Sequence, residues 1–447
     1  MSPDVRIIGG GMTGLTLALR LAQRGHGVVV HERDPYLGGL TSESMLGDVR
    51  VERFYHCVSP TDSALLGLLE EVGLGDAVGW NRTRTGFFDG KRLLEMTTVA
   101  DFLSFPLLGL LDRLRLGWTI AYCGLNRSWK RLDRMPVGTF LRRHAGARVF
   151  DAIWEPLLLA KLGPEYDRFA ASFIWATIYR MLSARKAKGK AEKLGFVRGR
   201  YGRVFSALRA AIESAGGSVC VGSPVQGISQ VEHDEAARWL VRIDGADLPT
   251  RSLALCVPAP IAAAWLEQIL PHATAALRKV EYLGIVCEAL LLRRSLTPYY
   301  ILNLTDRALP FTGIIETSNL AGKDEFKGHA LVYVPRFRDQ SSDIWARTDD
   351  DIHSETIDGL RHVVPDLHEE DVIQWRVHRA RYVQPVHRVN SGNDLPPVRL
   401  APGLGYMSAA QIHPWPVFND EVVRLVDRRL EEILAVLEVG DRTVTTS

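Results

Sequence analysis

A glycine-rich turn between a short apolar segment and a helix constrains this chain more than any other feature of its sequence. Residues 9–14 read Gly-Gly-Gly-Met-Thr-Gly and satisfy the pattern G-x-G-x-x-G. The apolar segment at residues 5–8 predicts a strand, the spacing over 13–24 predicts a helix, and residues 28–30 predict a second strand. Two such strands joined by a helix within about 30 residues form a βαβ unit with parallel strands. The beginning of the chain therefore predicts a Rossmann-type α/β domain.

Each glycine of the pattern has a physical reason to be there. Gly9 allows the tight turn out of the strand, Gly11 lets the backbone approach a pyrophosphate, and Gly14 allows close packing of helix on strand. The helix N-terminus then offers free N–H groups and a partial positive charge to phosphates. Glu32 follows the second strand, where it can accept hydrogen bonds from ribose hydroxyls. Because Glu32 would repel a 2′-phosphate, the motif favours NAD or FAD and leaves both open.

A second pair of glycines, Gly38-Gly39, comes shortly after Glu32. A glycine pair at this position lets another backbone segment approach the cofactor. The stretch Gly38-Gly39-Leu40-Thr41-Ser42 resembles the second glycine motif of the amine oxidase and protoporphyrinogen oxidase superfamily of flavoproteins, in which an Arg usually stands where this chain has Leu40. The resemblance implies that the cofactor is FAD.

The resemblance continues along the chain. Residues 51–56, which end in Phe-Tyr-His, are similar to the segment of UDP-galactopyranose mutases that places an aromatic residue and a His beside the flavin. Residues 199–202 resemble the second entry of the chain into the FAD domain, and the Val225 backbone would then lie near adenine. Residues 403–408 resemble the C-terminal strand, which leads to Asn419 at the start of the last helix.

These features together predict the domain organisation. We expect an α/β fold with a discontinuous Rossmann-type (GR2-like) FAD-binding domain and an inserted α+β substrate domain. The FAD-binding domain would comprise residues 1–85, 196–275 and 396–447. The substrate-binding domain would comprise residues 86–195, which look helix-rich, and 276–395, where strands dominate.

Composition narrows the partners and the compartment. The chain has 447 residues, a net charge of +2 and 46% hydrophobic residues, so nothing demands a nucleic acid partner. Its five cysteines are dispersed and form no Cys-x-x-Cys pair, which predicts no metal site and no disulfide framework. No signal peptide fits before the first strand, and no apolar run reaches the roughly 18 residues of a transmembrane helix. The expected location is the cytoplasm, and the oligomeric state stays open.

The resemblance also implies a set of cofactor contacts. FAD should be bound non-covalently, because Ser408 and the three residues after it stand where covalent-flavin relatives carry a Cys. The expected cofactor-binding residues are Gly9, Gly11, Met12, Thr13, Gly14, Glu32, Arg33, Gly38, Gly39, Leu40, Thr41, His56, Val225, Ser408 and Asn419.

Three residues are the catalytic candidates. His56 could donate a hydrogen bond near the flavin or shuttle a proton near neutral pH, or it could be a structural core residue. Glu316 and Asn319 fall in a predicted polar strand, whose alternation would place them on opposite faces. Glu316 is a candidate acid or base, with a surface ion pair as the alternative. Further candidates are His413, in a Pro-Trp loop, and four cations that could hold an anionic substrate, namely Arg82, Arg84, Lys161 and Arg180.

Three functions fit these observations. The first is an FAD-dependent oxidoreductase in which a small-molecule substrate delivers hydride to flavin N5. The second is a non-redox sugar-nucleotide mutase resembling UDP-galactopyranose mutase, which would use reduced flavin. The third is a binding or membrane-docked protein with residues 102–125 as an amphipathic anchor, because an interfacial helix tolerates the charges of Asp112, Arg113 and Arg115.

Overall fold

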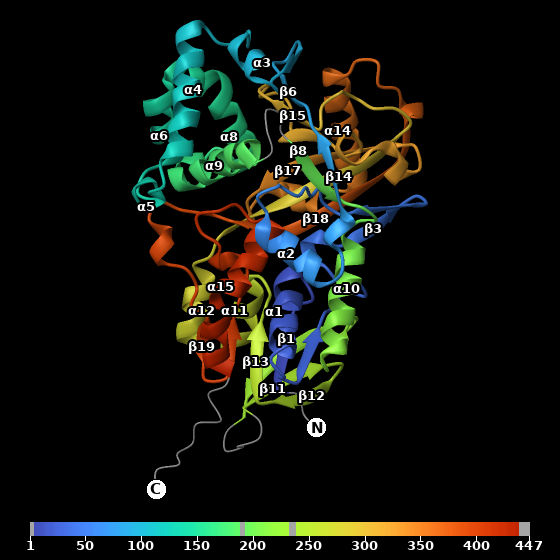
Figure 1. Ribbon diagram of the computed structural model, residues 1–447, viewed down its shortest axis with the longest axis vertical. Helices are drawn as coiled ribbons and strands as arrows, with labels where there is room; N and C mark the ends of the chain where they lie inside the picture. The colour runs from blue at the N-terminus through green and yellow to red at the C-terminus, as the bar shows by residue number, and fades with distance from the viewer. Residues whose placement is uncertain (1–3, 188–192, 232–237, 438–447) are drawn as a thin grey trace.

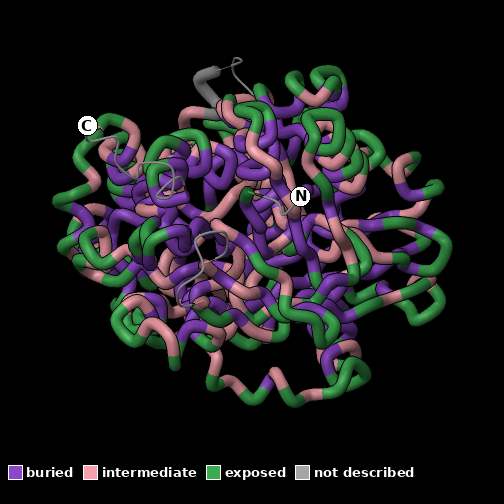
Figure 2. The backbone as a smooth tube through the Cα atoms, turned by 90° about the horizontal axis from the view of Figure 1, so that it is seen from below, coloured by how far each residue is buried: buried purple, intermediate pink, exposed green. Residues whose placement is uncertain are grey.

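Two large sheets and a helical unit make up the molecule (Figure 1). The computed structural model describes residues 4–187, 193–231 and 238–437. The backbone drawn by burial shows buried segments running through the middle and exposed loops around them (Figure 2).

The first sheet has six strands in the order β19-β20-β13-β1-β2-β9. Parallel pairing joins all of its strands except β19, which pairs antiparallel with β20. Short runs of Val, Ile and Leu make these strands, as is usual for a parallel sheet that is covered on both faces. The strands are β1 (Val5–Ile8), β2 (Val28–His31), β9 (Ser218–Cys220), β13 (Ser252–Leu255), β19 (Arg399–Ala401) and β20 (Leu404–Tyr406). This sheet confirms the predicted α/β class.

Side chains alternate between the two faces of this sheet. Ile7 belongs to a core formed with helices α1 (Met12–Ala22), α10 (Tyr201–Ser214) and α15 (Asn419–Leu437). Its neighbour Ile8 belongs to a second core, formed with the small sheet β10-β11-β12 and helix α11 (Ala259–Leu266). The period of two along a strand thus produces a layer of helices on one side and a layer of strands on the other.

The second sheet has seven strands in the order β18-β14-β17-β16-β15-β6-β7. Its pairs are antiparallel except for β15 with β6. Every residue of the long central strand β14 is buried, between the flanking strands and helix α14 (Asp349–Val363). The strands are β6 (Thr85–Phe88), β7 (Leu93–Glu95), β14 (Tyr282–Leu292), β15 (Ile301–Leu304), β16 (Gly313–Glu316), β17 (Ala330–Arg338) and β18 (Val372–Pro385).

The helical unit lies at the end of the molecule opposite the two chain termini (Figure 1). Its core contains Phe140, Phe150 and Phe173. Its main helices are α3 (Val99–Leu103), α4 (Leu110–Leu125), α6 (Val137–Ala145), α8 (Glu155–Leu162) and α9 (Ala171–Ala187).

Short elements connect these parts. The hairpin β3 (Glu43–Leu46) and β4 (Val49–Glu52) follows the second glycine pair, and β5 (Val78–Arg82) pairs with β8 (Lys193–Val197). They carry residues 52–56 and 196–201 into the region between the two sheets. The remaining elements include α2 (Ser63–Glu71), α5 (Trp129–Leu132), α7 (Ala147–Val149), β10 (Val225–Gln230), β11 (Trp239–Ile243), β12 (Ala246–Thr250), α12 (Pro271–Arg278) and α13 (Ser318–Ala321).

One predicted element is wrong. The polar run at residues 316–319 is not a strand, because β16 ends at Glu316 and helix α13 begins at Ser318. Thr317 between them already has helical backbone angles, φ −61° and ψ −29°. Small polar residues form helix caps and first turns readily, so this run turns as soon as its pairing with β17 ends at Glu316.

Candidate functional site

The first glycine turn leaves space at Gly11 and none at its three other glycines. A Cβ on Gly14 would stand 1.9 Å from the Gly9 carbonyl oxygen, and a Cβ on Gly9 would stand 2.5 Å from the Cys256 carbonyl oxygen. A Cβ on Gly11 would meet nothing closer than the Gly39 Cα, at 4.0 Å. Gly9 and Gly14 are therefore required by the packing of the protein itself, whereas the backbone at Gly11 faces open space that a ligand can enter.

The N-terminus of α1 is suited to an anion. Gly11 is its N-cap and offers no side-chain cap, and no acidic residue occupies the first turn. The first N–H groups of a helix have no partner within the helix. The N–H groups of Met12, Thr13 and Gly14 can thus donate to a pyrophosphate, supported by the helix dipole.

The second glycine pair lies directly against the first turn. Gly38 and Gly39 have φ angles of 114° and 57°, which side-chain-bearing residues rarely adopt. The Gly38 N–H donates to the Gly10 carbonyl at 2.9 Å, and Gly11 forms a parallel bridge with Gly38. Two motifs that are separated by more than twenty residues in sequence therefore form one cradle of backbone, which we call the glycine cradle (residues 9–14 and 38–39).

Glu32 borders the glycine cradle. Its Oε2 accepts the Gly10 N–H at 2.7 Å and its Oε1 accepts the Asp34 N–H at 2.9 Å. Burial raises the pKa of this carboxyl, although the two N–H donors oppose the shift. A carboxylate has about four acceptor positions, so Glu32 keeps capacity for ribose hydroxyls. The cradle, the open Gly11 and this carboxylate fit an adenine dinucleotide.

The other predicted cofactor contacts divide into two groups. Thr41 Oγ1 donates to Asn419 Oδ1 at 3.2 Å, so the segment directly after the glycine cradle touches the N-terminus of α15. Arg33 is largely exposed, and Val225 opens β10. The Ser408 hydroxyl shares a 2.6 Å hydrogen bond with the Tyr406 hydroxyl. Their cofactor contacts stay predictions, as does that of the half-buried Leu40.

His56 has a defined tautomer. Its Nδ1 lies 2.8 Å from the Phe54 carbonyl oxygen, which can only accept, so Nδ1 carries the proton and Nε2 is left as an acceptor. Burial lowers the pKa of His56 to about 4. The imidazole is therefore neutral near pH 7 and suits the role of hydrogen-bond acceptor rather than that of a proton shuttle titrating near neutrality.

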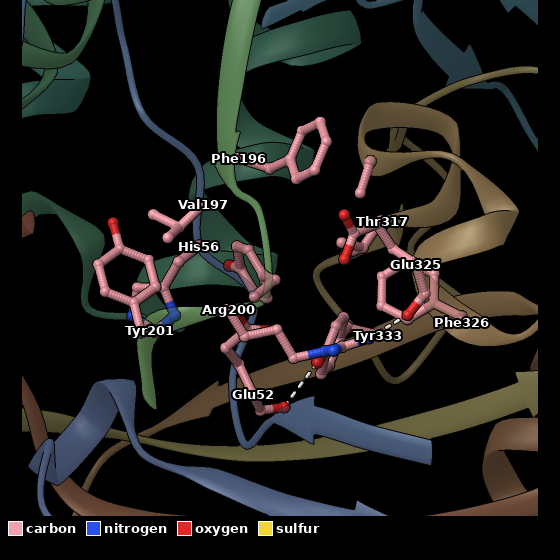
Figure 3. A pocket seen from close by; sticks show the side chains of 12 residues that line it. Glu52, His56, Phe196, Val197, Arg200, Tyr201, Thr317, Glu325, Phe326 and Tyr333 are labelled. Atoms are coloured by element: carbon pink, nitrogen blue, oxygen red, sulfur yellow. Dashed lines mark hydrogen bonds between the residues drawn. The ribbon is translucent and has the colours of Figure 1, made fainter. Parts of the chain in front are cut away.

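Beside His56 is a small hollow. Figure 3 shows that its side chains come from the seven-stranded sheet (Tyr333), from β8 and the start of α10, and from the segments around residues 52–56 and 317–326. The hydroxyls of Tyr201 and Thr317 are buried there without a hydrogen-bond partner among the described residues. The hollow is lined by Glu52, Tyr55, His56, Phe196, Val197, Arg200, Tyr201, Thr317, Ala321, Glu325, Phe326 and Tyr333.

Arg200 extends into this hollow from the start of α10 (Figure 3). Its φ of 69° is unusual for a residue with a side chain, and such strain is common at functional sites. Its guanidinium donates to the Glu325 carbonyl and lies 5.2 Å from the centre of the Phe326 ring. The Arg200 Nε is buried without a partner among the described residues. The sequence pattern at 199–202 indicated only the re-entry of the chain and gave no sign of a cation here.

Glu52, at the end of β4, is the other charged residue to note. Burial raises its pKa to about 7, against the opposing charge of Arg200. The Tyr333 hydroxyl donates to the Glu52 backbone carbonyl at 2.5 Å and fixes the strand end (Figure 3). Sequence reasoning did not single out Glu52, although an acid two residues before the Phe-Tyr-His segment was a signal that could have identified it.

Glu316 and Asn319 do not line the hollow. The Glu316 side chain is fully buried, and its Oε2 accepts the N–H groups of Leu296 and Thr297, each at 3.1 Å. The Asn319 amide donates to the carbonyls of Thr297 and Tyr299, each at 2.8 Å. Both side chains hold the loop before β15, away from the hollow, and their catalytic role stays a prediction. The surface ion pair proposed as an alternative for Glu316 is wrong, because the side chain is fully buried.

The other predicted polar residues also have partners away from the hollow. His413 Nε2 lies 2.7 Å from Asp133 Oδ1 in the helical unit. Arg84 pairs with Glu95, and Arg180 pairs with Asp62 at 2.6 Å. Arg82 is exposed to solvent, and the Lys161 ammonium lies over the rings of Phe173 and Phe337. The cation at the hollow is Arg200 instead.

Comparison with known proteins agrees with this geometry. Residues 12–404 match the family described as flavin containing amine oxidoreductase. A provisionally named protoporphyrinogen oxidase from Exiguobacterium has the same fold, with a TM-score of 0.72, 17% identity, and coverage of 96% of this chain and 98% of its own. Cyclohexylamine oxidase from Brevibacterium oxydans has a TM-score of 0.67 at 17% identity, with coverage of 98% of this chain and 100% of its own.

One curated relative is similar over a shorter stretch. A provisionally named flavin-containing monoamine oxidase of Mycobacterium tuberculosis, AofH, is 28% identical over 153 residues, which is 31% of this chain and 32% of the relative. The chain therefore matches about a third of that relative's length. The family match confirms the resemblance to flavoproteins of the amine oxidase superfamily that the glycine motifs indicated.

Proposed function

Because this chain belongs to the flavin containing amine oxidoreductase family, we propose that it is an FAD-dependent oxidoreductase that oxidises a small-molecule substrate. One observation carries the proposal: the two glycine motifs form a single backbone cradle with open space at Gly11, and Phe205, which packs against Gly38, links this cradle to Tyr201 of the hollow. FAD bound in the cradle supplies a two-electron acceptor that takes hydride at N5.

The residues of the cradle divide the binding of FAD among them. The N–H groups at the start of α1 hold the pyrophosphate, and Glu32 accepts hydrogen bonds from ribose hydroxyls. The pair Thr41–Asn419 directs the N-terminus of α15, another positive helix end, toward the flavin side of the cradle. The binding is non-covalent, because residues 403–419 contain no cysteine.

The hollow provides acid–base groups for the oxidation. Loss of hydride from a C–H bond leaves a proton on the neighbouring nitrogen or oxygen, and this proton needs an acceptor. Glu52 is suited to that role, because a carboxyl with a pKa of about 7 exchanges a proton readily at neutral pH. His56 Nε2 is a second acceptor, and the rings of Tyr55, Phe196 and Tyr333 exclude water from the reacting bond.

We further propose that the domains follow the two sheets. Residues 1–85, 196–275 and 396–447 would form the FAD-binding domain, and 86–195 with 276–395 the substrate-binding domain. All strands of the six-stranded sheet fall within the first set. The proposed boundaries at 85 and 195 fall inside strands β6 and β8. The actual domain limits therefore lie a few residues away, at the ends of these strands.

The test is anaerobic reduction of the purified flavoprotein. We expect the chain to be isolated with FAD that denaturation releases intact. A panel of amines, including cyclohexylamine and putrescine, which the names of structural neighbours give as substrates, is then mixed with it anaerobically. Bleaching of the flavin by a member of the panel, or by another C–H donor, supports the proposal. Turnover that needs pre-reduced flavin and transfers no net electrons would contradict it and favour a mutase.

A further inference from the structure

Helix α4 carries apolar side chains on two opposite faces. Leu116 and Cys123 are buried against the helical unit, as expected for a packed helix. Leu111 and Trp118 are nevertheless 72% and 60% exposed. The exposed set, which we call the α4 apolar face, comprises Leu110, Leu111, Leu114, Trp118 and Leu125.

The helical geometry gathers these five residues on one side. Successive residues are about 100° apart around a helix axis. From Leu110 onward, the five positions of the α4 apolar face fall within an arc of about 100°, and the buried positions lie opposite. Figure 1 shows α4 along the outer edge of the helical unit, at the end of the molecule far from the chain termini.

The neighbouring helix α3 extends this face. Val99 and Leu103 are one turn apart on α3 and are 73% and 55% exposed. The Phe102 ring packs over α4, 3.6 Å from where a Cβ on Gly117 would stand. Seven large apolar side chains thus protrude from two helices in contact, which is more than scattered surface residues account for.

The exposed charges of the stretch that carries this face have one sign. Every exposed charged residue between positions 99 and 134 is basic. The three acidic residues of this stretch are engaged elsewhere: Asp101 caps α3, Asp112 is buried against Arg148, and Asp133 is buried against His413. The exposed basic residues are Arg115, Arg127, Lys130, Arg131 and Arg134, and none of them makes an ion pair with a described residue.

We propose that α3 and α4 dock the molecule onto the surface of a bilayer that contains anionic phospholipid. Leucines and a tryptophan on one face with arginine and lysine beside them is the arrangement by which a helix lies in the interface between headgroups and acyl chains. The basic rim would then contact lipid phosphates. A second copy of the chain is a poorer partner, because two such faces in contact would bring two basic rims together. No helix of the described chain is long and apolar enough to cross the membrane.

The experiment is vesicle flotation with the full-length, flavin-loaded protein. Vesicles of phosphatidylcholine with phosphatidylglycerol should carry the protein upward, whereas vesicles of phosphatidylcholine alone should carry much less, and added salt should weaken the binding. The double variant Leu114→Glu/Trp118→Glu should lower the bound fraction by roughly an order of magnitude. The charge variant Lys130→Glu/Arg131→Glu should lose the preference for anionic vesicles.

The matched control is Met45→Glu, which changes an exposed apolar side chain on the β3–β4 hairpin and should leave flotation unchanged. Quenching of tryptophan fluorescence by brominated lipid gives a second readout that needs no destabilising change, and Trp118→Phe should reduce it. Protein that stays in the soluble fraction with both kinds of vesicle would overturn the proposal. So would a dimer in sedimentation that Leu114→Glu/Trp118→Glu dissociates, because the face would then be a contact between copies.

Discussion

The glycine cradle and the hollow are linked through Phe205 and Tyr201, yet the chain builds them in opposite ways. The cradle consists of backbone from two nearby stretches of sequence, and its function depends on the absence of side chains at Gly9, Gly11 and Gly14. The hollow consists of side chains from several distant segments, and its function depends on their charge, such as that of Glu52 and Arg200. Backbone shape leaves a legible pattern in sequence, whereas side chains that meet only after folding do not.

Changes to the glycine cradle should have the largest effects and should separate two kinds of glycine. Gly14→Ala places a Cβ 1.9 Å from the Gly9 carbonyl oxygen, so we expect the free energy of unfolding to fall by about 3 kcal/mol. Gly11→Ala has room within the protein and should leave apoprotein stability unchanged, but it should abolish flavin binding. Urea unfolding of apoprotein and flavin content measure the two effects. Full flavin content in Gly11→Ala would show that the cofactor does not approach there.

Glu316 tests whether a buried acid outside the hollow is structural. Glu316→Ala removes the acceptor for two buried N–H groups, those of Leu296 and Thr297, and should cost about 2 to 3 kcal/mol in unfolding free energy. Glu316→Gln keeps an acceptor and should cost less. Turnover per bound flavin should be unchanged in both variants. A tenfold loss of turnover in stable Glu316→Gln would instead support the catalytic role predicted for this residue.

Glu52 should show the reverse pattern. We expect Glu52→Gln to lower kcat by about 100-fold, because the proton acceptor is lost, with little change in stability below pH 4.5, where the carboxyl is protonated. In the unsubstituted enzyme the rate should rise as pH passes through about 7, where Glu52 ionises, and this rise should vanish in the variant. Asp48→Asn, an exposed acid in the same hairpin, is the control. An unchanged pH–rate profile in Glu52→Gln would remove Glu52 from the mechanism.

The pH dependence of stability should also differ in sign between Glu52 of the hollow and His31, whose backbone carbonyl accepts the Gly9 N–H of the cradle. His31, at the end of β2, has a pKa lowered to about 4, chiefly by burial and then by Arg6, so its contribution is present above its ordinary pKa of 6.5 and is lost as pH falls toward 4. The pKa of Glu52 is raised from 4.5 to about 7. Its contribution to the free energy of unfolding is therefore present below pH 4.5 and is lost as the pH rises through 7.

Each group changes the unfolding free energy by at most about 1.4 kcal/mol per pH unit. Chemical denaturation at a series of pH values, on the unsubstituted chain, His31→Gln and Glu52→Gln, measures both slopes. His31→Gln should flatten the acidic side only, and Glu52→Gln the side between pH 4.5 and 7. Equal flattening of both sides by either variant would contradict the assignment.

Arg200 should give the smallest effect on stability. Glycine adopts a φ of 69° without strain, so Arg200→Gly should raise the unfolding free energy by about 1 kcal/mol, less what the lost guanidinium contacts contributed. The KM of the Arg200→Gly variant should nevertheless rise about tenfold, because the hollow has lost its cation. Arg203→Gly, one turn into α10, should instead lower stability by about 1 kcal/mol and leave KM unchanged. If both variants behave alike, Arg200 has no special role.

The sequence alone determined the cofactor fold. Gly9, Gly11, Gly14 and Glu32 work through local backbone geometry and a spacing of about 20 residues, and both are written directly in the chain. The same holds for Gly38-Gly39, since a glycine pair marks a place where two backbones meet. His56 was found because a resemblance extends over its neighbours, although its tautomer and lowered pKa depend on the fold around it.

Only the tertiary structure decided which polar residues face the hollow. Glu316 and Asn319 were candidates as polar residues of a predicted strand, but the folded chain directs both side chains to backbone groups of the loop before β15. Glu52 and Arg200 looked ordinary among 52 acidic and 54 basic residues. Burial and mutual approach distinguish them, and these are properties of how distant segments pack, which no local pattern of residues encodes.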